Sequence, residues 1–197
     1  MPCGDYIGYM RIKYNAPTVL TFSLLCVLFL YLSKTIFPGL IENLFVVPQK
    51  DSFNPGFLIH WITIITHVMG HGDWSHLFSN IIFILVIGPM LEENYGSKPL
   101  LLMIFITALV TGVLNILFFP NPLMGASGVV FMMILLSSFT NFNRGEIPLT
   151  FIFVLILFMG EQIMKLLNSE ESNISYFAHI IGGLCGSFFG FFRMTRK

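Results

Sequence analysis

Charged residues are scarce in this sequence. Asp, Glu, Lys and Arg make up only 10% of its 197 residues, whereas a typical soluble domain carries about 25%. The ten basic and ten acidic residues cancel to a formal net charge of zero. Nothing in this balance supports electrostatic binding of nucleic acid. The three cysteines do not form a disulfide framework.

Apolar residues are abundant instead. Hydrophobic side chains make up 55% of the chain, and the mean hydropathy is +0.82. One small soluble core cannot hide this much apolar surface, so the composition predicts an all-α integral membrane protein whose outer residues face lipid. The apolar runs are continuous, which excludes spanning strands, because those alternate in segments of about ten residues.

Six apolar runs are near the roughly 20 residues that a helix needs to cross a bilayer. They cover about residues 16–37, 74–93, 99–119, 125–140, 148–167 and 176–192. The sequence therefore predicts one six-span membrane domain over 16–193, between a cytoplasmic segment, 1–15, and a cytoplasmic tail, 194–197. The stretch 38–73 contains three prolines and an aromatic run around Trp61, and it is interpreted as a loop lying against the membrane interface.

The basic residues predict the orientation of the six spans. Both termini then lie on one side, and placing them in the cytoplasm puts seven basic residues inside and three outside, as the positive-inside rule favours. The inner residues are Arg11, Lys13, Lys98, Arg144, Arg193, Arg196 and Lys197, and the outer ones are Lys34, Lys50 and Lys165. The size and the minimal set of spans favour a bacterial plasma membrane.

This topology brings polar residues from three spans to one depth. The second, fourth and sixth spans run from outside to inside, and His76, Ser127 and His179 each lie near the start of one of them. At 1.5 Å per residue, the three residues lie within roughly 6 Å of the same level. Polar side chains inside lipid face one another or a water-filled cavity, so the sequence predicts a shared buried site.

The residue types at this depth suit nucleophilic catalysis. Ser127 needs a base, and a buried, neutral His179 can accept its proton. His76 and Asn80 are four residues apart on one helix face. With the backbone N–H of Ser127 they are suited to form an oxyanion hole, in which each donor contributes roughly 3 kcal/mol. Phe131, four residues after Ser127, is expected to stack on the His179 ring.

Simpler explanations remain open for these features. The small residues of Gly125-Ala126-Ser127-Gly128 are typical of close helix packing, and so are Gly182, Gly186 and Gly190. His67 and His71 have the spacing of metal ligands, but Val68 occupies the position of the Glu in H-E-x-x-H. No metal or other cofactor is therefore predicted. A small proton-coupled or metal-handling transporter using these histidines stays an alternative, and Glu161 in the fifth run has no assigned role.

Taken in order, these residues resemble the rhomboid family of intramembrane serine proteases. The resemblance covers about residues 58–190. It consists of His67-Val68-Met69-Gly70-His71, His76-Leu77-Phe78-Ser79-Asn80, Glu92 with Gly96-Ser97, Gly125-Ala126-Ser127-Gly128 and Ala178-His179-Ile180-Ile181-Gly182. It implies a six-helix rhomboid bundle that cleaves single-span membrane proteins near the outer face of the bilayer, with the fifth span at a lateral gate.

The resemblance also implies roles for individual residues. Ser127 would be the nucleophile and His179 the general base, with His76 and Asn80 at the oxyanion. The supporting residues would be His71, Phe131 and Gly125, and Glu92 would be a buried structural carboxylate.

Two positions depart from the family pattern. Ile62 follows Trp61 where the family often has Arg, and Phe131 stands where it often has Tyr. Phenylalanine keeps the ring for stacking, so activity is expected to survive the second change. A catalytically silent relative that binds membrane clients remains the main alternative, and the sequence does not indicate an oligomeric state.

Overall fold

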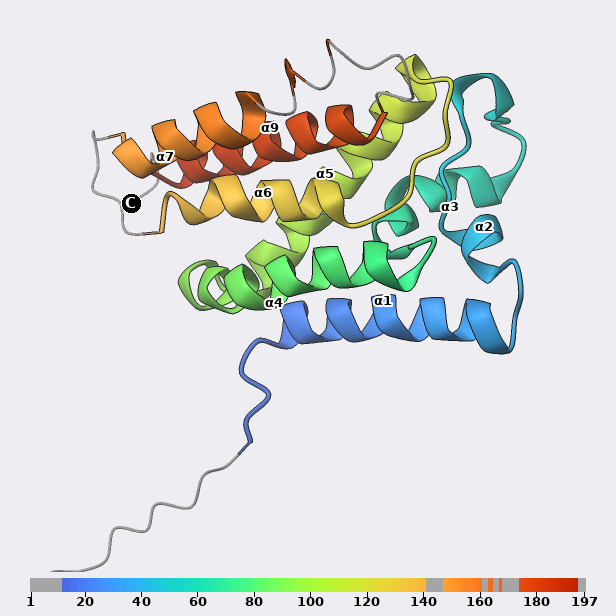
Figure 1. Cartoon of the computed structure of the whole chain (residues 1–197), viewed down its shortest axis with the longest axis horizontal. Coiled ribbons are helices and arrows are strands. Elements are labelled where there is room, and N and C mark those ends of the chain that lie inside the picture. Colours follow the sequence, from blue (N-terminus) through green and yellow to red (C-terminus); the bar gives the residue numbers. More distant parts are fainter. Residues whose placement is uncertain (1–11, 141–146, 161–162, 165–166, 168–173, 195–197) are drawn as a thin grey trace, which may run out of the picture.

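The computed structural model describes residues 12–140, 147–160, 163–164, 167 and 174–194. Within these ranges the secondary structure is helical, and extended backbone pairs only at an isolated bridge between Val47 and Leu123. The predicted all-α class is confirmed for this part of the chain. Figure 1 shows that most of the helices run roughly along the long axis of the molecule and are stacked across it.

Three helices are long and apolar enough to cross a membrane. They are α1 (Pro17–Thr35), α4 (Trp74–Tyr95) and α5 (Ser97–Phe118). The 19 residues of α1 rise about 28 Å, close to the thickness of the hydrocarbon core. The predicted runs 16–37, 74–93 and 99–119 match these helices to within a few residues.

The other apolar helices are shorter. They are α6 (Ser127–Ser137), α7 (Leu149–Val154) with its π-helical continuation η3 (Leu155–Met159), and α9 (Ile174–Met194), whose apolar part is Tyr176–Phe192. The 11 residues of α6 rise only about 17 Å, which is less than a full crossing. The count of six spans therefore stays a prediction.

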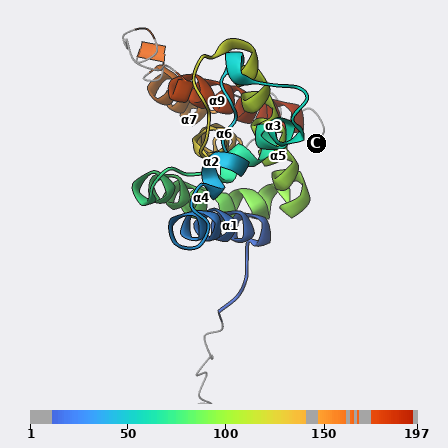
Figure 2. The same ribbon diagram turned by 90° about the vertical axis from the view of Figure 1, so that its right-hand side faces the viewer.

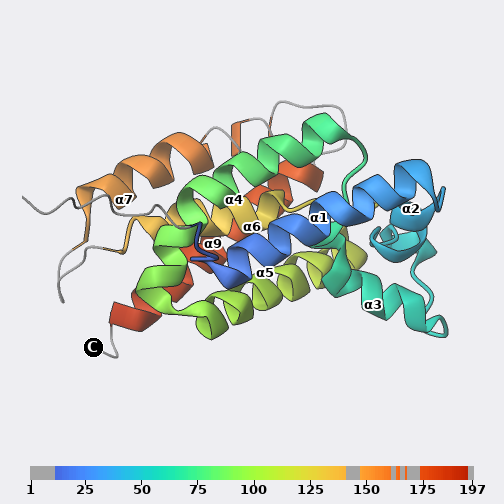
Figure 3. The same cartoon turned by 90° about the horizontal axis from the view of Figure 1, so that it is seen from below.

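The segment 38–73 is more ordered than the expected interfacial loop. It forms α2 (Leu40–Leu44), η1 (Lys50–Ser52), α3 (Leu58–Thr66) and η2 (His67–Met69). Helix α3 packs on α5 because Gly112 leaves room for the backbone of Ile64. The segment therefore contains short helices where a loop was expected, and Figure 3 shows α2 and α3 gathered at one end of the bundle. Its position at the membrane interface stays a prediction.

Helix α6 lies at the centre of the molecule. Helices α1, α4, α6 and α9 stack in that order, and α5 packs against all four (Figures 1 and 2). Nearly every residue from Gly128 to Leu136 is buried, as expected of a helix that is apolar all round. Helices α4, α6 and α9 run in the same direction, so their N-terminal ends meet at one end of the bundle (Figure 1).

Candidate active site

A cavity of about 240 Å³ lies where α4, α6 and α9 begin. Its walls carry both polar and apolar side chains from these three helices. They are His76, Ser79, Asn80 and Phe83 from α4, Ser127, Val130 and Phe131 from α6, and His179 from α9. The structure thus brings together the predicted nucleophile, the predicted base and the two predicted oxyanion donors, although they come from stretches up to about a hundred residues apart.

The turn before Ser127 requires glycine at position 125. Gly125 has φ +115°, a conformation that other residues adopt with strain. A Cβ at this position would lie 2.8 Å from both Cε1 and Nε2 of His76, so the imidazole packs directly on the glycine backbone. The Gly125 N–H donates to the carbonyl of His67 at 3.0 Å. This turn therefore sets the start of α6 against the first turn of α4.

His67 supports the same turn from behind the cavity. Its ring is buried between the carbonyl of Ile64, 3.0 Å from Nδ1, and the hydroxyl of Thr111, 3.3 Å from Nε2. The carbonyl is an acceptor, so Nδ1 carries the proton. His67 thus joins α3, α5 and the turn before Ser127, although it does not line the cavity.

His71 lies behind the cavity as well, fully buried between η2 and α4. Its Nε2 is 3.3 Å from the side-chain amide of Asn80 and 3.5 Å from the backbone N–H of Ala126. Both partners are donors, so Nε2 is the acceptor and the ring is neutral. Burial lowers the pKa of His71 to about 4, and the adjacent His76 acts in the same direction. A neutral His71 therefore links Asn80 to the residue before Ser127.

The amide of Asn80 is already engaged in this arrangement. Its Nδ2 donates to the His76 carbonyl at 2.9 Å and to His71 at 3.3 Å. Those two bonds use both hydrogens of the amide nitrogen. Donation into the cavity therefore requires Asn80 to exchange one of them, and the longer bond to His71 is the weaker of the two.

Contacts between α6 and α9 fix the position of His179. The His179 ring stacks on Phe131 with centroids 4.3 Å apart and planes 5° from parallel. Behind this stack the two helices make the most extensive contact of any pair of elements. A Cβ at Gly182 would overlap the carbonyl of Gly128, and one at Gly186 would overlap that of Met132. The glycines therefore let the two backbones touch.

Two carboxylates act at helix N-termini rather than in the cavity. Asp73 caps α4 by accepting the His76 N–H at 2.8 Å, and this bond holds the pKa of the Asp73 carboxyl below its usual value. Glu92 accepts the N–H groups of Thr18 and Val19 at 2.8 and 3.0 Å, so it caps α1. Sequence reasoning missed Asp73, although an Asp directly before an apolar helical run is a usual capping signal.

Several further residues were missed or lie elsewhere. Ser79, Phe83 and Val130 line the cavity, and only the helical spacing from His76, Asn80 and Ser127 could have indicated them. Among the described residues, no group of three or more His, Cys, Asp or Glu side chains could hold a metal ion. Glu161 lies outside the described residues.

Comparisons with known proteins agree with this architecture. Residues 59–196 match the model of the rhomboid domain. The chain is 32% identical over 136 residues to the rhomboid protease GluP of Bacillus subtilis, covering 66% of this chain and 25% of GluP. It is 24% identical over 140 residues to the chloroplastic rhomboid-like protein 11 of Arabidopsis thaliana, covering 64% of this chain and 50% of that protein.

A third relative matches a shorter stretch. The rhomboid-like protease 3 of Toxoplasma gondii is 40% identical over 65 residues, which are 32% of this chain and 25% of that protein. The chain thus spans a quarter to half of the length of these curated relatives. The domain match covers well over half of the sequence, so this integral membrane protein belongs to the rhomboid family.

Proposed function

We propose that the protein is an intramembrane serine endopeptidase with a Ser127–His179 dyad. The observation that carries the proposal is the single cavity of about 240 Å³ that both residues line together with His76 and Asn80. A nucleophile, a base and two candidate oxyanion donors around one space form a set suited to acyl transfer.

The reaction would begin at the Ser127 hydroxyl. Its oxygen attacks the carbonyl carbon of a peptide bond while the proton passes to the His179 ring. The carbonyl oxygen becomes negative, and His76, Asn80 and the Ser127 backbone N–H stabilise it. His179 then gives the proton to the leaving amine, and water hydrolyses the acyl-enzyme with His179 acting as base. No cofactor takes part in these steps.

The substrates in this proposal are single-span membrane proteins. Their peptide bonds would be cut near the bilayer face at which α4, α6 and α9 begin. The distribution of basic residues assigns that face to the outside of a bacterial plasma membrane, with both termini in the cytoplasm. Reporter fusions at residues 97 and 121 test this orientation, because the first would then report the cytoplasm and the second the outside.

Labelling with a fluorophosphonate tests the dyad directly. We expect the purified protein to be labelled, Ser127→Ala to lose all labelling and His179→Ala to lose at least 100-fold in rate. Ser137→Ala is the matched control, since Ser137 ends the same helix and its hydroxyl bonds to the carbonyl of Ile134. A folded wild-type protein that is never labelled would favour the silent, client-binding relative instead.

Cleavage of a membrane substrate is the second measurement. The protein and a single-span test substrate are reconstituted together in liposomes, and cleavage products are identified by mass spectrometry. Products ending inside or at the edge of the span, absent with Ser127→Ala, support the proposal. If the protein is labelled but cleaves none of a panel of single-span substrates, the data would support an activated serine but not the proposed endopeptidase activity.

A further inference from the structure

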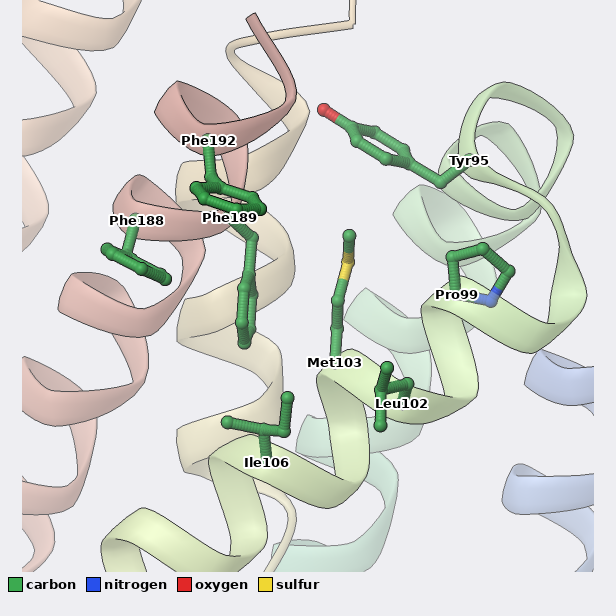
Figure 4. Close-up of a pocket in the computed structure, with 8 residues that line it drawn as sticks. All are labelled: Tyr95, Pro99, Leu102, Met103, Ile106, Phe188, Phe189 and Phe192. Atoms are coloured by element: carbon green, nitrogen blue, oxygen red, sulfur yellow. The ribbon is translucent and has the colours of Figure 1, made fainter. Parts of the chain in front are cut away.

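Two hollows in the bundle differ in the polar groups they offer. One lies between α5 and α9, and its walls are apolar apart from Tyr95 (Figure 4). The cavity at Ser127 instead has five polar side chains in its walls, those of His76, Ser79, Asn80, Ser127 and His179. Four of these have a role in the proposed reaction, as oxyanion donor, nucleophile or base. Ser79 is the one without a role.

Ser79 lies on a side of α4 that faces lipid. It follows Trp74, the first residue of α4, by five residues, which places it about 8 Å along the helix. Ser79 is exposed, and the neighbouring apolar side chains of Phe78, Ile82 and Phe83 are 52%, 60% and 46% exposed. Phe83, one turn further along, also lines the cavity. The cavity therefore reaches the surface along this side of α4, and Ser79 lies at its mouth.

A hydrogen bond within the helix orients the Ser79 hydroxyl. It donates to the carbonyl of His76, three residues earlier, at 2.8 Å. A serine hydroxyl has one hydrogen and two lone pairs, so this bond leaves the oxygen able to accept. Such a bond to the preceding turn also satisfies a serine that merely faces lipid. It gives no reason, however, for Ser79 to line the cavity.

A membrane span that unwinds in this cavity brings unpaired N–H groups of its own. Each helical residue donates its N–H to the carbonyl four residues earlier, and these bonds open around a peptide bond that Ser127 attacks. No water replaces the lost carbonyls beside lipid, so the freed N–H groups need acceptors from the protein. His76 and Asn80 are donors in the proposed reaction, and His179 keeps its lone pair for the serine proton. The oxygen of Ser79 remains as the acceptor.

We propose that the Ser79 oxygen accepts a hydrogen bond from a backbone N–H of the unwound substrate, beside the bond that is cut. Ser79 is then a substrate-positioning residue. Because the bond is made to the backbone, it selects no particular side chain. It favours spans that unwind readily and so present a free N–H at this depth. The inference takes its substrate class from the proposed function but does not require that the substrate be cleaved.

A matched pair of variants tests the hydrogen bond. Ser79→Thr keeps the hydroxyl, and Ser79→Val has the shape of threonine without it. Both are made in the full chain with Ser127→Ala, and binding of fluorescent single-span peptides is measured by energy transfer in liposomes. We expect the Kd of Ser79→Thr to stay within about two-fold of that with serine, and Ser79→Val to bind roughly five-fold more weakly or worse, since an unpaired buried donor is costly.

Ser75→Ala is the control, because Ser75 is exposed in the first turn of the same helix and does not line the cavity. It should leave the Kd unchanged. Equal affinities of folded Ser79→Thr and Ser79→Val would overturn the inference, and so would a protein that binds none of a panel of such peptides.

A single ester bond in the peptide then identifies the donor. Replacing one amide by an ester removes one N–H, and the ester is moved along the outer part of the span. At one position we expect it to weaken binding roughly five-fold or more when residue 79 is serine, with no further effect in Ser79→Val, because both changes remove the same bond. Ester effects that are the same in both proteins at every position would overturn the inference. Binding is measured without Ser127, so a protein that never reacts with fluorophosphonate can still pass this test, and a reactive one can fail it.

Discussion

The two sides of α6 are built in opposite ways. Toward α9, glycines bring backbone against backbone, with no room for a single added carbon at Gly182 or Gly186. Toward α4, the first turns of the helices leave a cavity of about 240 Å³. The close side holds Ser127 and His179 in a fixed relation, and the open side leaves space between them and the donors of α4. In the proposed enzyme, the close side of α6 would position the catalytic pair and the open side would admit the substrate.

The largest expected effect comes from breaking the close side. Gly182→Ala places a methyl group on the Gly128 carbonyl, so α9 must move away from α6. We expect a loss of about 3 kcal/mol in unfolding free energy, at the upper end for overpacked cores, together with at least a 100-fold loss of fluorophosphonate labelling. Thermal or denaturant unfolding in detergent measures the first, and labelling rates measure the second.

A glycine elsewhere provides the control for this experiment. Gly160 has helical backbone angles, and a Cβ there would meet nothing within 4 Å. Gly160→Ala should therefore change stability by no more than about 1 kcal/mol, in the stabilising direction. If Gly182→Ala is as stable and as reactive as Gly160→Ala, the contact between α6 and α9 does not position the two residues.

The contrast between the two sides of α6 was only partly predictable from the sequence. Three long apolar runs predicted α1, α4 and α5 to within a few residues, because burial in lipid requires uninterrupted apolar residues. The four-residue spacing from Gly182 to Gly190 predicted close packing without naming the neighbour. The helices within 38–73 were not predicted, because Leu40–Leu44 is too short to show a helical period and because α3 is stabilised by its contact with α5.

The candidate site, too, was only partly predictable from the sequence. Equal depth on parallel helices placed His76, Ser127 and His179 around one space, while their catalytic roles remain predictions. The bonds from His71 to Asn80 and Ala126 span 9 and 55 residues. Such contacts depend on how η2 and the turn at Gly125 fold over one another. No local pattern in the sequence determines that packing.

The second prediction concerns the open side. If His76 donates to the oxyanion, His76→Ala lowers kcat for a membrane substrate by roughly 100- to 1,000-fold, with little effect on unfolding. Asn80→Ala should cost a similar factor, and it also removes the bonds to His71 and to the His76 carbonyl. Activities within a few-fold of wild type in both variants would exclude the oxyanion role for α4.

The third prediction tests whether the open side depends on the glycine turn. Gly125→Ala combines an unfavourable φ with a contact of 2.8 Å to the His76 ring, and such local strain costs roughly 1–3 kcal/mol. We expect a ten- to hundred-fold lower kcat/KM. Adding His76→Ala removes the ring that the methyl group meets, so the double variant should lose less activity than the product of the two single losses. Strictly multiplicative losses would show that the backbone strain, and not the ring contact, is responsible.

The smallest expected effect concerns the stacked rings of Phe131 and His179, which join α6 to α9 at the edge of the cavity. Phe131 packs face to face on His179 and lies nearly perpendicular to the ring of Phe158, so it orients the proposed base without taking a proton. Such a stack contributes about 0.5–1.5 kcal/mol, and Phe131→Ala should therefore reduce the labelling rate only about two- to thirteen-fold. Phe131→Tyr keeps the ring and should retain the wild-type rate. A loss in Phe131→Ala as large as that in His179→Ala would mean that the stack sets the chemistry of the histidine, and equal losses in Phe131→Ala and Phe131→Tyr would mean that stacking is not what position 131 contributes.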